Sequence, residues 1–296
     1  MDLAYLREHP HLVPTMLTHQ RIRETPVPGG SICAATRLTL DDGTSLFAKA
    51  WRGPGPVPEH FFATEAAGLT WLREAGAAAV PEVVAALPEL LVLEWVDPAP
   101  ATPAAAHRFG RELAALHRTG ATGFGAPWPG FIGALPMPND ASPGPWPGWF
   151  AQRRLAPYLK ISADRGALSA TDVTAVERLL SDIDRYAGPA VDEAPTRIHG
   201  DLWPGNLLWS TGRVWLVDPA AHGGHRETDL ANLALFGGAP HLDRILAGYQ
   251  EVYPLAAGWQ RRVPLHQLHL LLVHTALFGS SYRSAVMSAV RATVDQ

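Results

Sequence analysis

Cysteine and lysine are scarce in this chain of 296 residues. The single cysteine, Cys33, cannot form a disulfide within the chain, which is typical of a protein from a reducing cytosol. The first ten residues, MDLAYLREHP, have neither a basic start nor an apolar stretch, so we expect no secretory signal peptide. Together these absences predict a cytoplasmic location.

Long hydrophobic runs and an excess of positive charge are also absent. The longest apolar run near the end, residues 268–278, is interrupted by His269 and His274 and is too short to cross a bilayer. The formal net charge of −4 leaves no basic surface that would neutralise nucleic-acid phosphates. We therefore expect neither a membrane nor a nucleic acid as a partner.

The segment HGDLWPGN at residues 199–206 contains one acidic and one amide side chain, Asp201 and Asn206. Asp201 and Asn206 are five positions apart, the spacing of a kinase catalytic loop, in which the Asp takes the substrate hydroxyl proton and the Asn holds Mg²⁺. Asp218 follows an apolar run twelve residues later, where the second metal-binding Asp of such a site would lie. The pair predicts a phosphotransferase, with Asp201 as the catalytic base and Asn206 and Asp218 as metal ligands. The alternative is a structural loop.

Only two lysines occur, Lys49 and Lys160. Lys49 lies in a predicted hairpin over residues 34–50, and Glu65 follows sixteen positions later on a predicted helix over 59–74. In kinases a strand Lys holds the ATP phosphates and pairs with a helix Glu, which predicts the same role for Lys49 and Glu65. The alternative is a lysine on an edge strand that points to water.

Two further segments fit a nucleotide site. Gly29, Gly30 and Ser31 come just before the first predicted strand, and small residues allow the backbone to approach phosphate oxygens. Glu94 and Val96 follow a predicted strand, residues 90–93, where two lobes would join, and the backbone of that connection would meet the adenine edge. The alternatives are a plain turn and an ordinary strand end.

The segments HGDLWPGN (199–206) and DPAAHGGHRETDLANLALFGG (218–238) resemble the fructosamine kinase, or ketosamine-3-kinase, family. Trp203 and the stretch 224–230 are the most specific marks, and the resemblance extends from about Gly29 to Tyr282. It implies a protein-kinase-like α+β fold and an ATP- and Mg²⁺-dependent transfer to the 3-hydroxyl of a ketosamine, a sugar linked to an amine by glycation. The acceptor would be a small ketosamine, a glycated amino acid or a glycated protein.

The resemblance also implies supporting and substrate residues. Asp229 would accept backbone N–H bonds from the catalytic loop, and His199 would brace that loop. Trp203 and His274 are the expected acceptor contacts, with packing as the alternative for each. Gly200 stands where protein kinases carry an Arg that answers a phosphorylated activation loop, so we expect no such control. Further candidates for the acceptor pocket are Asn139, Trp146 and Trp149.

The pattern along the chain predicts two lobes. Residues 1–95 would form a small β-rich N-lobe with one helix, and residues 96–296 a larger, mainly helical C-lobe. Residues 123–149 read as a long connection without periodicity. Two other functions remain open: a kinase of the same branch that acts on an aminoglycoside, choline, homoserine or methylthioribose, and a non-catalytic nucleotide-binding pseudokinase. The oligomeric state is not predicted.

Overall fold

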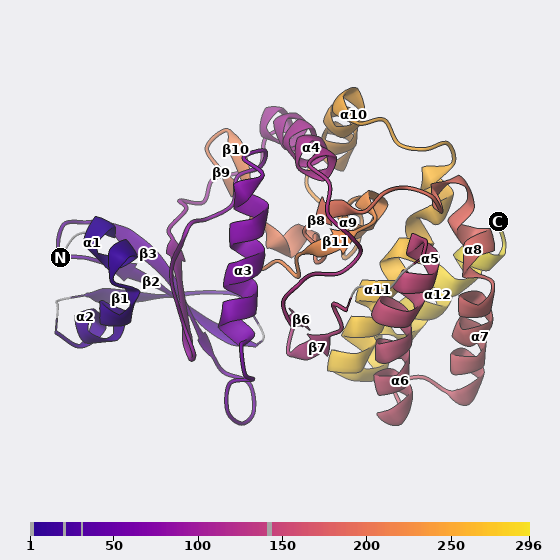
Figure 1. Cartoon of the computed structure of the whole chain (residues 1–296), viewed down its shortest axis with the longest axis horizontal. Helices are drawn as coiled ribbons and strands as arrows, with labels where there is room; N and C mark the ends of the chain where they lie inside the picture. The colour runs from indigo at the N-terminus through magenta and orange to yellow at the C-terminus, as the bar shows by residue number, and fades with distance from the viewer. Residues whose placement is uncertain (1–2, 20–21, 31, 141–143) are drawn as a thin grey trace.

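The computed structural model describes residues 3–19, 22–30, 32–140 and 144–296. It has a β-rich N-terminal part and a helical C-terminal part, which lie side by side in Figure 1. This confirms the expected α+β class. Within the described ranges, no helix is long and apolar enough to cross a membrane.

The N-terminal part is built on one antiparallel sheet of five strands in the order β1-β2-β3-β5-β4. Asp42 shapes the β2–β3 turn, since its Oδ1 accepts the Thr44 N–H at 2.8 Å, and Gly43 has a φ of 85°. The strands and helices are β1 (Arg23–Val27), β2 (Cys33–Thr39), β3 (Ser45–Trp51), β4 (Val83–Leu87), β5 (Leu90–Glu94), α1 (Leu3–Glu8), α2 (Val13–His19) and α3 (Phe61–Glu74).

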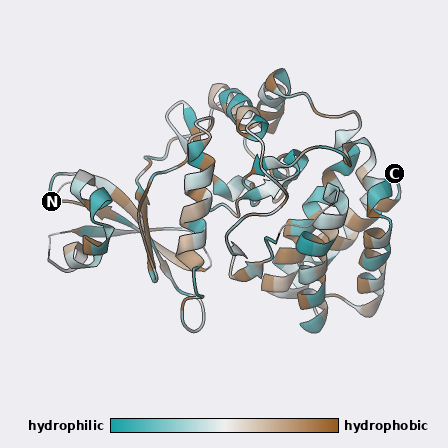
Figure 2. Ribbon diagram, in the orientation of Figure 1, coloured by the Kyte–Doolittle hydropathy of each residue, from teal (hydrophilic) through white to brown (hydrophobic). Residues whose placement is uncertain are grey.

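Each face of this sheet is covered. Leu46 and Ala48 of β3 pack with Leu6 and Met16 of the N-terminal helices, while α3 covers the face toward the C-terminal part. The hydropathy colouring of Figure 2 shows hydrophobic residues along these strands and on α3. Successive side chains of β3 alternate between the two faces: Leu46 and Ala48 are buried on one, and Phe47 and Lys49 face α3 on the other.

The C-terminal part begins with α4 (Pro103–Arg118), which Thr102 caps through the Ala105 N–H at 3.2 Å. This part also contains three two-stranded sheets: β6 (Gly130–Ile132) with β7 (Leu135–Met137), β8 (Thr196–Ile198) with β11 (His222–Gly224), and β9 (Leu207–Ser210) with β10 (Arg213–Leu216). The helices are α5 (Trp146–Phe150), a π-helical turn (Ala151–Leu155), α6 (Ala156–Asp164), α7 (Ala170–Ser181), α8 (Ile183–Ala187), α9 (Arg226–Asn232), α10 (Leu242–Val252), α11 (Trp259–Phe278) and α12 (Arg283–Val294).

Three expectations about elements were incomplete. The glycine segment does not precede the first strand but connects β1 to β2. The stretch 123–149 is not devoid of structure, since it contains the β6–β7 hairpin. The helices α1 and α2 were not predicted. The division at residue 95 stays a prediction: β5 ends at Glu94, but one apolar cluster joins Leu91 and Leu93 to residues of α4.

Candidate active site

Lys49 lies between two carboxylates. Its Nζ donates to both oxygens of Glu65 on α3, at 2.8 and 3.0 Å, and to Asp218 Oδ1 at 2.9 Å. Its strand, β3, is the centre of the sheet, so the alternative of an edge-strand lysine is wrong. The Lys49 side chain is only 13% exposed, and burial of its charge requires such partners. The structure thus joins three residues that are expected at the phosphates.

Burial and charge act against each other in this trio. Burial would lower the pKa of Lys49, but Asp218 and Glu65 outweigh it and raise that pKa. Burial would raise the pKa of Asp218, but the Lys49 ammonium holds it below its usual value. Burial raises the pKa of Glu65. The site therefore holds a protonated lysine beside an ionised Asp218.

Asn206 links the catalytic loop to Asp218. Its Nδ2 donates to the Asp201 carbonyl at 2.8 Å and to Asp201 Oδ2 at 3.0 Å, and lies 3.4 Å from the Asp218 carbonyl oxygen. The amide nitrogen is used by these bonds, so Asn206 can offer Oδ1 to a cation. Asp218 itself has a φ of 53°, a left-handed conformation that is uncommon outside glycine and often found at functional sites.

Asp201 is partly buried. Burial raises the pKa of its carboxyl well above the usual range, and the Asn206 amide offsets only part of this effect. Asp218 and Asp229 add to the increase through their charges. A carboxylate with a raised pKa accepts a proton more readily, which is the property that a general base needs.

Asp229 holds the backbone ahead of Asp201. Its Oδ2 accepts the His199 N–H at 2.7 Å and its Oδ1 accepts the Gly200 N–H at 2.9 Å. His199 Nε2–H donates to the Val217 carbonyl at 2.9 Å, so that Nδ1 accepts the Asp201 N–H at 3.2 Å. Burial lowers the pKa of His199, which keeps this ring neutral. Both residues therefore lie where supporting roles were expected.

Gly200 is required by its surroundings. It has a φ of 82°, and a Cβ at this position would lie 2.2 Å from the Ala220 carbonyl oxygen. No arginine fits there, because its Cβ would meet this carbonyl in a backbone conformation that favours glycine.

Sequence reasoning missed His117 on α4. Its Nε2 lies 3.2 Å from Asp229 Oδ2 and its Nδ1 lies 2.8 Å from the Tyr249 hydroxyl, and both His117 and Asp229 are fully buried. The His117 imidazole thus contacts a buried carboxylate that lies 112 positions away in sequence. No local pattern links the two positions. The one signal in the sequence was a polar residue, His117, on the face of α4 that packs into the core.

The expected nucleotide segments lie as follows. Gly29 and Gly30 have φ values of 115° and 75° in the β1–β2 connection, while Ser31 lies outside the described residues. The Glu94 side chain accepts the Glu82 N–H at 3.2 Å, and Val96 is buried. A contact of this connection with adenine would therefore come from the backbone, and the nucleotide roles stay predictions.

Trp203 and His274 lie in one cluster of rings. The Trp203 ring is 5.7 Å from Phe236, and Phe236 is 4.5 Å from His274, centroid to centroid. Gly205 makes room for the indole, since a Cβ there would lie 2.1 Å from it. Both Trp203 and His274 are partly exposed. Their roles as acceptor contacts stay predictions.

The further acceptor candidates, Asn139, Trp146 and Trp149, are buried in the C-terminal part. Asn139 Oδ1 accepts from Arg154 Nη2 at 2.8 Å, and the Arg154 guanidinium lies over the Trp149 ring at 4.4 Å. Arg154 Nε also donates to His222 Nε2 at 3.3 Å. Arg154 thus joins Asn139 and Trp149 to His222 of β11, and a role of the three candidates at the acceptor stays a prediction.

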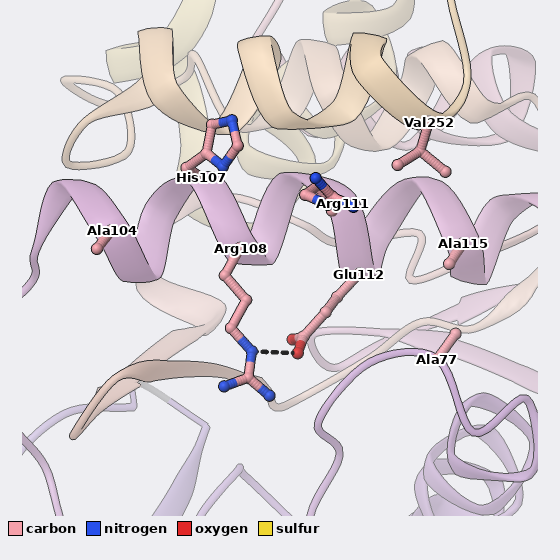
Figure 3. A pocket seen from close by; sticks show the side chains of 8 residues that line it. All are labelled: Ala77, Ala104, His107, Arg108, Arg111, Glu112, Ala115 and Val252. Carbon is pink, nitrogen blue, oxygen red and sulfur yellow. Dashed lines mark hydrogen bonds and ion pairs between the residues drawn. The ribbon is translucent and has the colours of Figure 1, made fainter.

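Two other features do not belong to this site. A hollow of about 430 Å³ lies between α4 and α10, and Figure 3 shows that its charged side chains come from α4. Arg108 is paired with Glu112 there at 2.8 Å. In the described part of the chain, His225, Glu227 and His266 could together face a metal ion, but Arg262 already binds both oxygens of Glu227.

The chain is similar in sequence to proteins of one known family. The sequence model described as Fructosamine kinase matches residues 11–296. A protein from Thermus thermophilus assigned as a ketoamine kinase is 35% identical over 268 residues, which cover 90% of this chain and 93% of that protein. The chloroplastic protein-ribulosamine 3-kinase of Arabidopsis thaliana is 32% identical over 274 residues, 89% of this chain and 80% of that protein.

Solved structures agree. A protein from Thermobifida fusca assigned as a fructosamine-3-kinase superposes with a TM-score of 0.88 at 46% identity, covering 99% of this chain and 98% of that one. The gentamicin complex of APH(2")-IIa has a TM-score of 0.64 at 13% identity over 100% and 97% of the two chains, and so shares the fold. The expected kinase-like fold is confirmed. Because the family model matches residues 11–296, nearly the whole chain, the chain belongs to the fructosamine kinase family.

Proposed function

We propose that this protein is a phosphotransferase that moves the γ-phosphoryl group of ATP to the 3-hydroxyl of a ketosamine. One observation carries the proposal: Lys49, Asp201, Asn206 and Asp218 meet at one place in a chain of the fructosamine kinase family. The relatives' names support the acceptor, since they include a ketoamine kinase and a ribulosamine 3-kinase. Intact charged residues argue against a pseudokinase.

Asp201 would act as the general base. Its carboxylate accepts the proton of the acceptor hydroxyl as that oxygen attacks phosphorus, and its raised pKa favours this transfer. Asn206 orients the carboxylate by its hydrogen bond to Oδ2. Asp229 fixes the backbone on which Asp201 is carried. Positioning and charge neutralisation provide most of the acceleration in reactions of this type.

Lys49 would hold the α- and β-phosphates, with Glu65 restraining its side chain on the sheet. The oxygens of Asp218 and Asn206 fit Mg²⁺, which prefers hard oxygen ligands. When bound, Mg²⁺ would neutralise charge on the phosphates. Asp218 contacts Lys49 through Oδ1, so its other oxygen, Oδ2, is the one that could bind the metal ion.

The acceptor side favours a ketosamine over an aminoglycoside. Polycationic acceptors call for an acidic pocket, whereas Trp203 and His274 contact the aromatic side chains of Phe236 and Tyr282. A sugar can stack on the indole, and a single ammonium can lie against aromatic faces. Choline, homoserine and methylthioribose, the other acceptors expected for this branch, have no specific support in the site.

A panel of acceptors tests the proposal. Purified protein would be incubated with ATP and Mg²⁺ and with a ribulosamine, a fructosamine, choline, homoserine, methylthioribose or an aminoglycoside, and phosphate incorporation would be measured. We expect incorporation with the ketosamines alone. Transfer to choline or an aminoglycoside, with none to either ketosamine, would show that the acceptor is misassigned.

A further inference from the structure

Five aromatic rings extend from the catalytic loop to the surface. Trp203 contacts Phe236, and His274 lies 4.5 Å from Phe236, 5.0 Å from Tyr282 and 5.6 Å from Phe278 between ring centroids. We call the four outer residues, Phe236, His274, Phe278 and Tyr282, the aromatic rim. They come from the segment after α9, from α11 and from the turn before α12.

Two rings of the aromatic rim are unusually exposed for their size. Phe236 is 40% and Phe278 is 47% exposed, and they are two of the four exposed large hydrophobic residues in the described part of the chain. Aromatic rings ordinarily gain their free energy from burial. Exposed rings that gather beside the catalytic loop are therefore typical of a binding surface.

Phe236 is held in a costly backbone conformation. Its φ is 52°, in the left-handed region that a bulky side chain rarely adopts, and Gly237 and Gly238 follow with φ values of 98° and 79°. A glycine at 236 would adopt this conformation without strain. The strain is kept although the ring is not buried, so burial does not account for the phenylalanine.

His274 adds a polar atom to the rim. Its Nδ1–H donates to the Leu270 carbonyl at 2.8 Å, which leaves Nε2 as an acceptor. Burial lowers the pKa of His274, so the ring is neutral at neutral pH. A neutral imidazole among aromatic faces can accept a hydrogen bond from an ammonium group without repelling its charge.

We propose that the aromatic rim binds the amine-bearing arm of the acceptor, a secondary ammonium that continues into an alkyl chain, as in a lysine side chain carrying the sugar. The inference rests on the proposed function, which puts the sugar hydroxyl at Asp201 and the sugar ring near Trp203. The arm then leaves over Phe236 toward Phe278 and Tyr282. Cation–π attraction and apolar contact both suit one charge on an alkyl chain, and none of the four rim residues carries a carboxylate, which a polycation would need.

Matched acceptors separate the sugar from its arm. We would compare KM and kcat for a ketosamine with an unsubstituted amino group, for the Nε-lysine adduct of the same sugar, and for that adduct within a short peptide. In wild type the KM for the lysine adduct should be lower by about tenfold, the scale of a cation–π contact plus apolar burial. If the peptide and the free lysine adduct have similar kcat/KM values, the rim also accepts a lysine within a polypeptide. If activity is lost on the peptide, the rim accepts only free glycated lysine.

Three variants test the rim. Phe236→Gly removes the ring and relieves the backbone, Phe236→Leu keeps apolar volume but not the π face, and Tyr282→Ala shortens the outer end. Each should raise the KM for the lysine adduct, with Phe236→Gly abolishing most of the preference, while KM for the unsubstituted ketosamine and for ATP stays within about twofold. Val294→Ala, an exposed apolar truncation on α12, is the control and should change neither.

Thermal unfolding shows whether each variant is folded, and Phe236→Gly should unfold no earlier than wild type. If Phe236→Gly does not fold, Phe236→Leu and Tyr282→Ala carry the test. Equal changes for both acceptors, or no change for either, would overturn the assignment of the rim. A wild-type protein that phosphorylates no ketosamine would instead overturn the proposed function, which the first measurement reveals before any variant is made.

Discussion

Lys49 Nζ lies 2.9 Å from Asp218 Oδ1, across the junction of the sheet and the C-terminal part. The two residues are 169 positions apart in sequence. This ion pair, with Glu65 on the other side of the ammonium, ties the central strand β3 to the loop that carries the proposed metal ligand. Nucleotide and metal would therefore enter a site whose charged groups are already assembled.

Asp218→Ala should weaken Mg²⁺-dependent nucleotide binding more than Asn206→Ala. Asp218 is anionic and contacts Lys49, whereas Asn206 offers only an amide oxygen. Calorimetry with a non-hydrolysable ATP analogue, with and without Mg²⁺, measures the difference. Equal Mg²⁺-dependent affinity in wild type and in Asp218→Ala would remove Asp218 from the metal site.

The pH dependence of kcat/KM should show an acid limb set by Asp201. Its pKa is raised by burial, and the base is active only when ionised, so the rate falls as pH decreases through this raised pKa. We expect the midpoint to lie above that of an ordinary aspartate, which is about 4. An acid limb whose midpoint is that of an ordinary aspartate would contradict Asp201 with a raised pKa as the base.

Trp203→Ala should raise the KM for every ketosamine while leaving the KM for ATP within a few-fold. The indole follows the proposed base by two residues and borders the aromatic rim. Unlike the rim variants, this change should affect substituted and unsubstituted acceptors alike. If a folded Trp203→Ala protein keeps both constants, the indole is a packing residue.

Arg262→Ala should destabilise the protein by about 3–5 kcal/mol, because it leaves the carboxylate of Glu227 buried without its partner. The pair is 4% and 2% exposed, with N–O distances of 2.6 and 2.8 Å. Lys160→Ala removes an ion pair of 2.6 Å that is 75% and 60% exposed, and should cost less than about 1 kcal/mol. Chemical denaturation of both variants gives the comparison, and similar losses would show that burial does not decide the effect.

The same pair has a pH signature. Burial would raise the pKa of Glu227, but Arg262, together with His266 and His225, outweighs it and lowers the pKa to about 2. A carboxyl with a lowered folded pKa adds stability above its unfolded pKa and loses it as pH falls. The contribution of Glu227 should thus disappear between about pH 5 and pH 2. Glu227→Gln should abolish that part of the acid dependence.

Local spacing explains what could be predicted from the sequence. Asp201 and Asn206 are five residues apart and Lys49 and Glu65 sixteen, so hairpin, helix and loop patterns suffice to propose their contacts. His117 and Asp229 come from segments that only tertiary packing joins, and no periodicity links them.

Packing also explains the remaining differences. The rings of Trp203, Phe236 and His274 meet through the packing of three distant segments, so the aromatic rim could not be read from sequence. Asn139 and Trp149 were candidates for the acceptor pocket. Both are buried and contact Arg154, which lies on a π-helical turn, and no local pattern predicts these contacts.

The most direct test of the account is phosphate transfer by wild type and Asp201→Asn under identical conditions, with the phosphorylated carbon of the ketosamine located by NMR. Asp201→Asn keeps the shape of the side chain but cannot accept the proton. Because the folded pKa of Asp201 is raised, ionised Asp201 costs stability at neutral pH, so the variant should be folded and at least as stable as wild type. We expect phosphate on the 3-hydroxyl with wild type and turnover lower by at least about a hundredfold in Asp201→Asn. Near-wild-type turnover in the folded variant, or phosphate on another hydroxyl, would contradict the account.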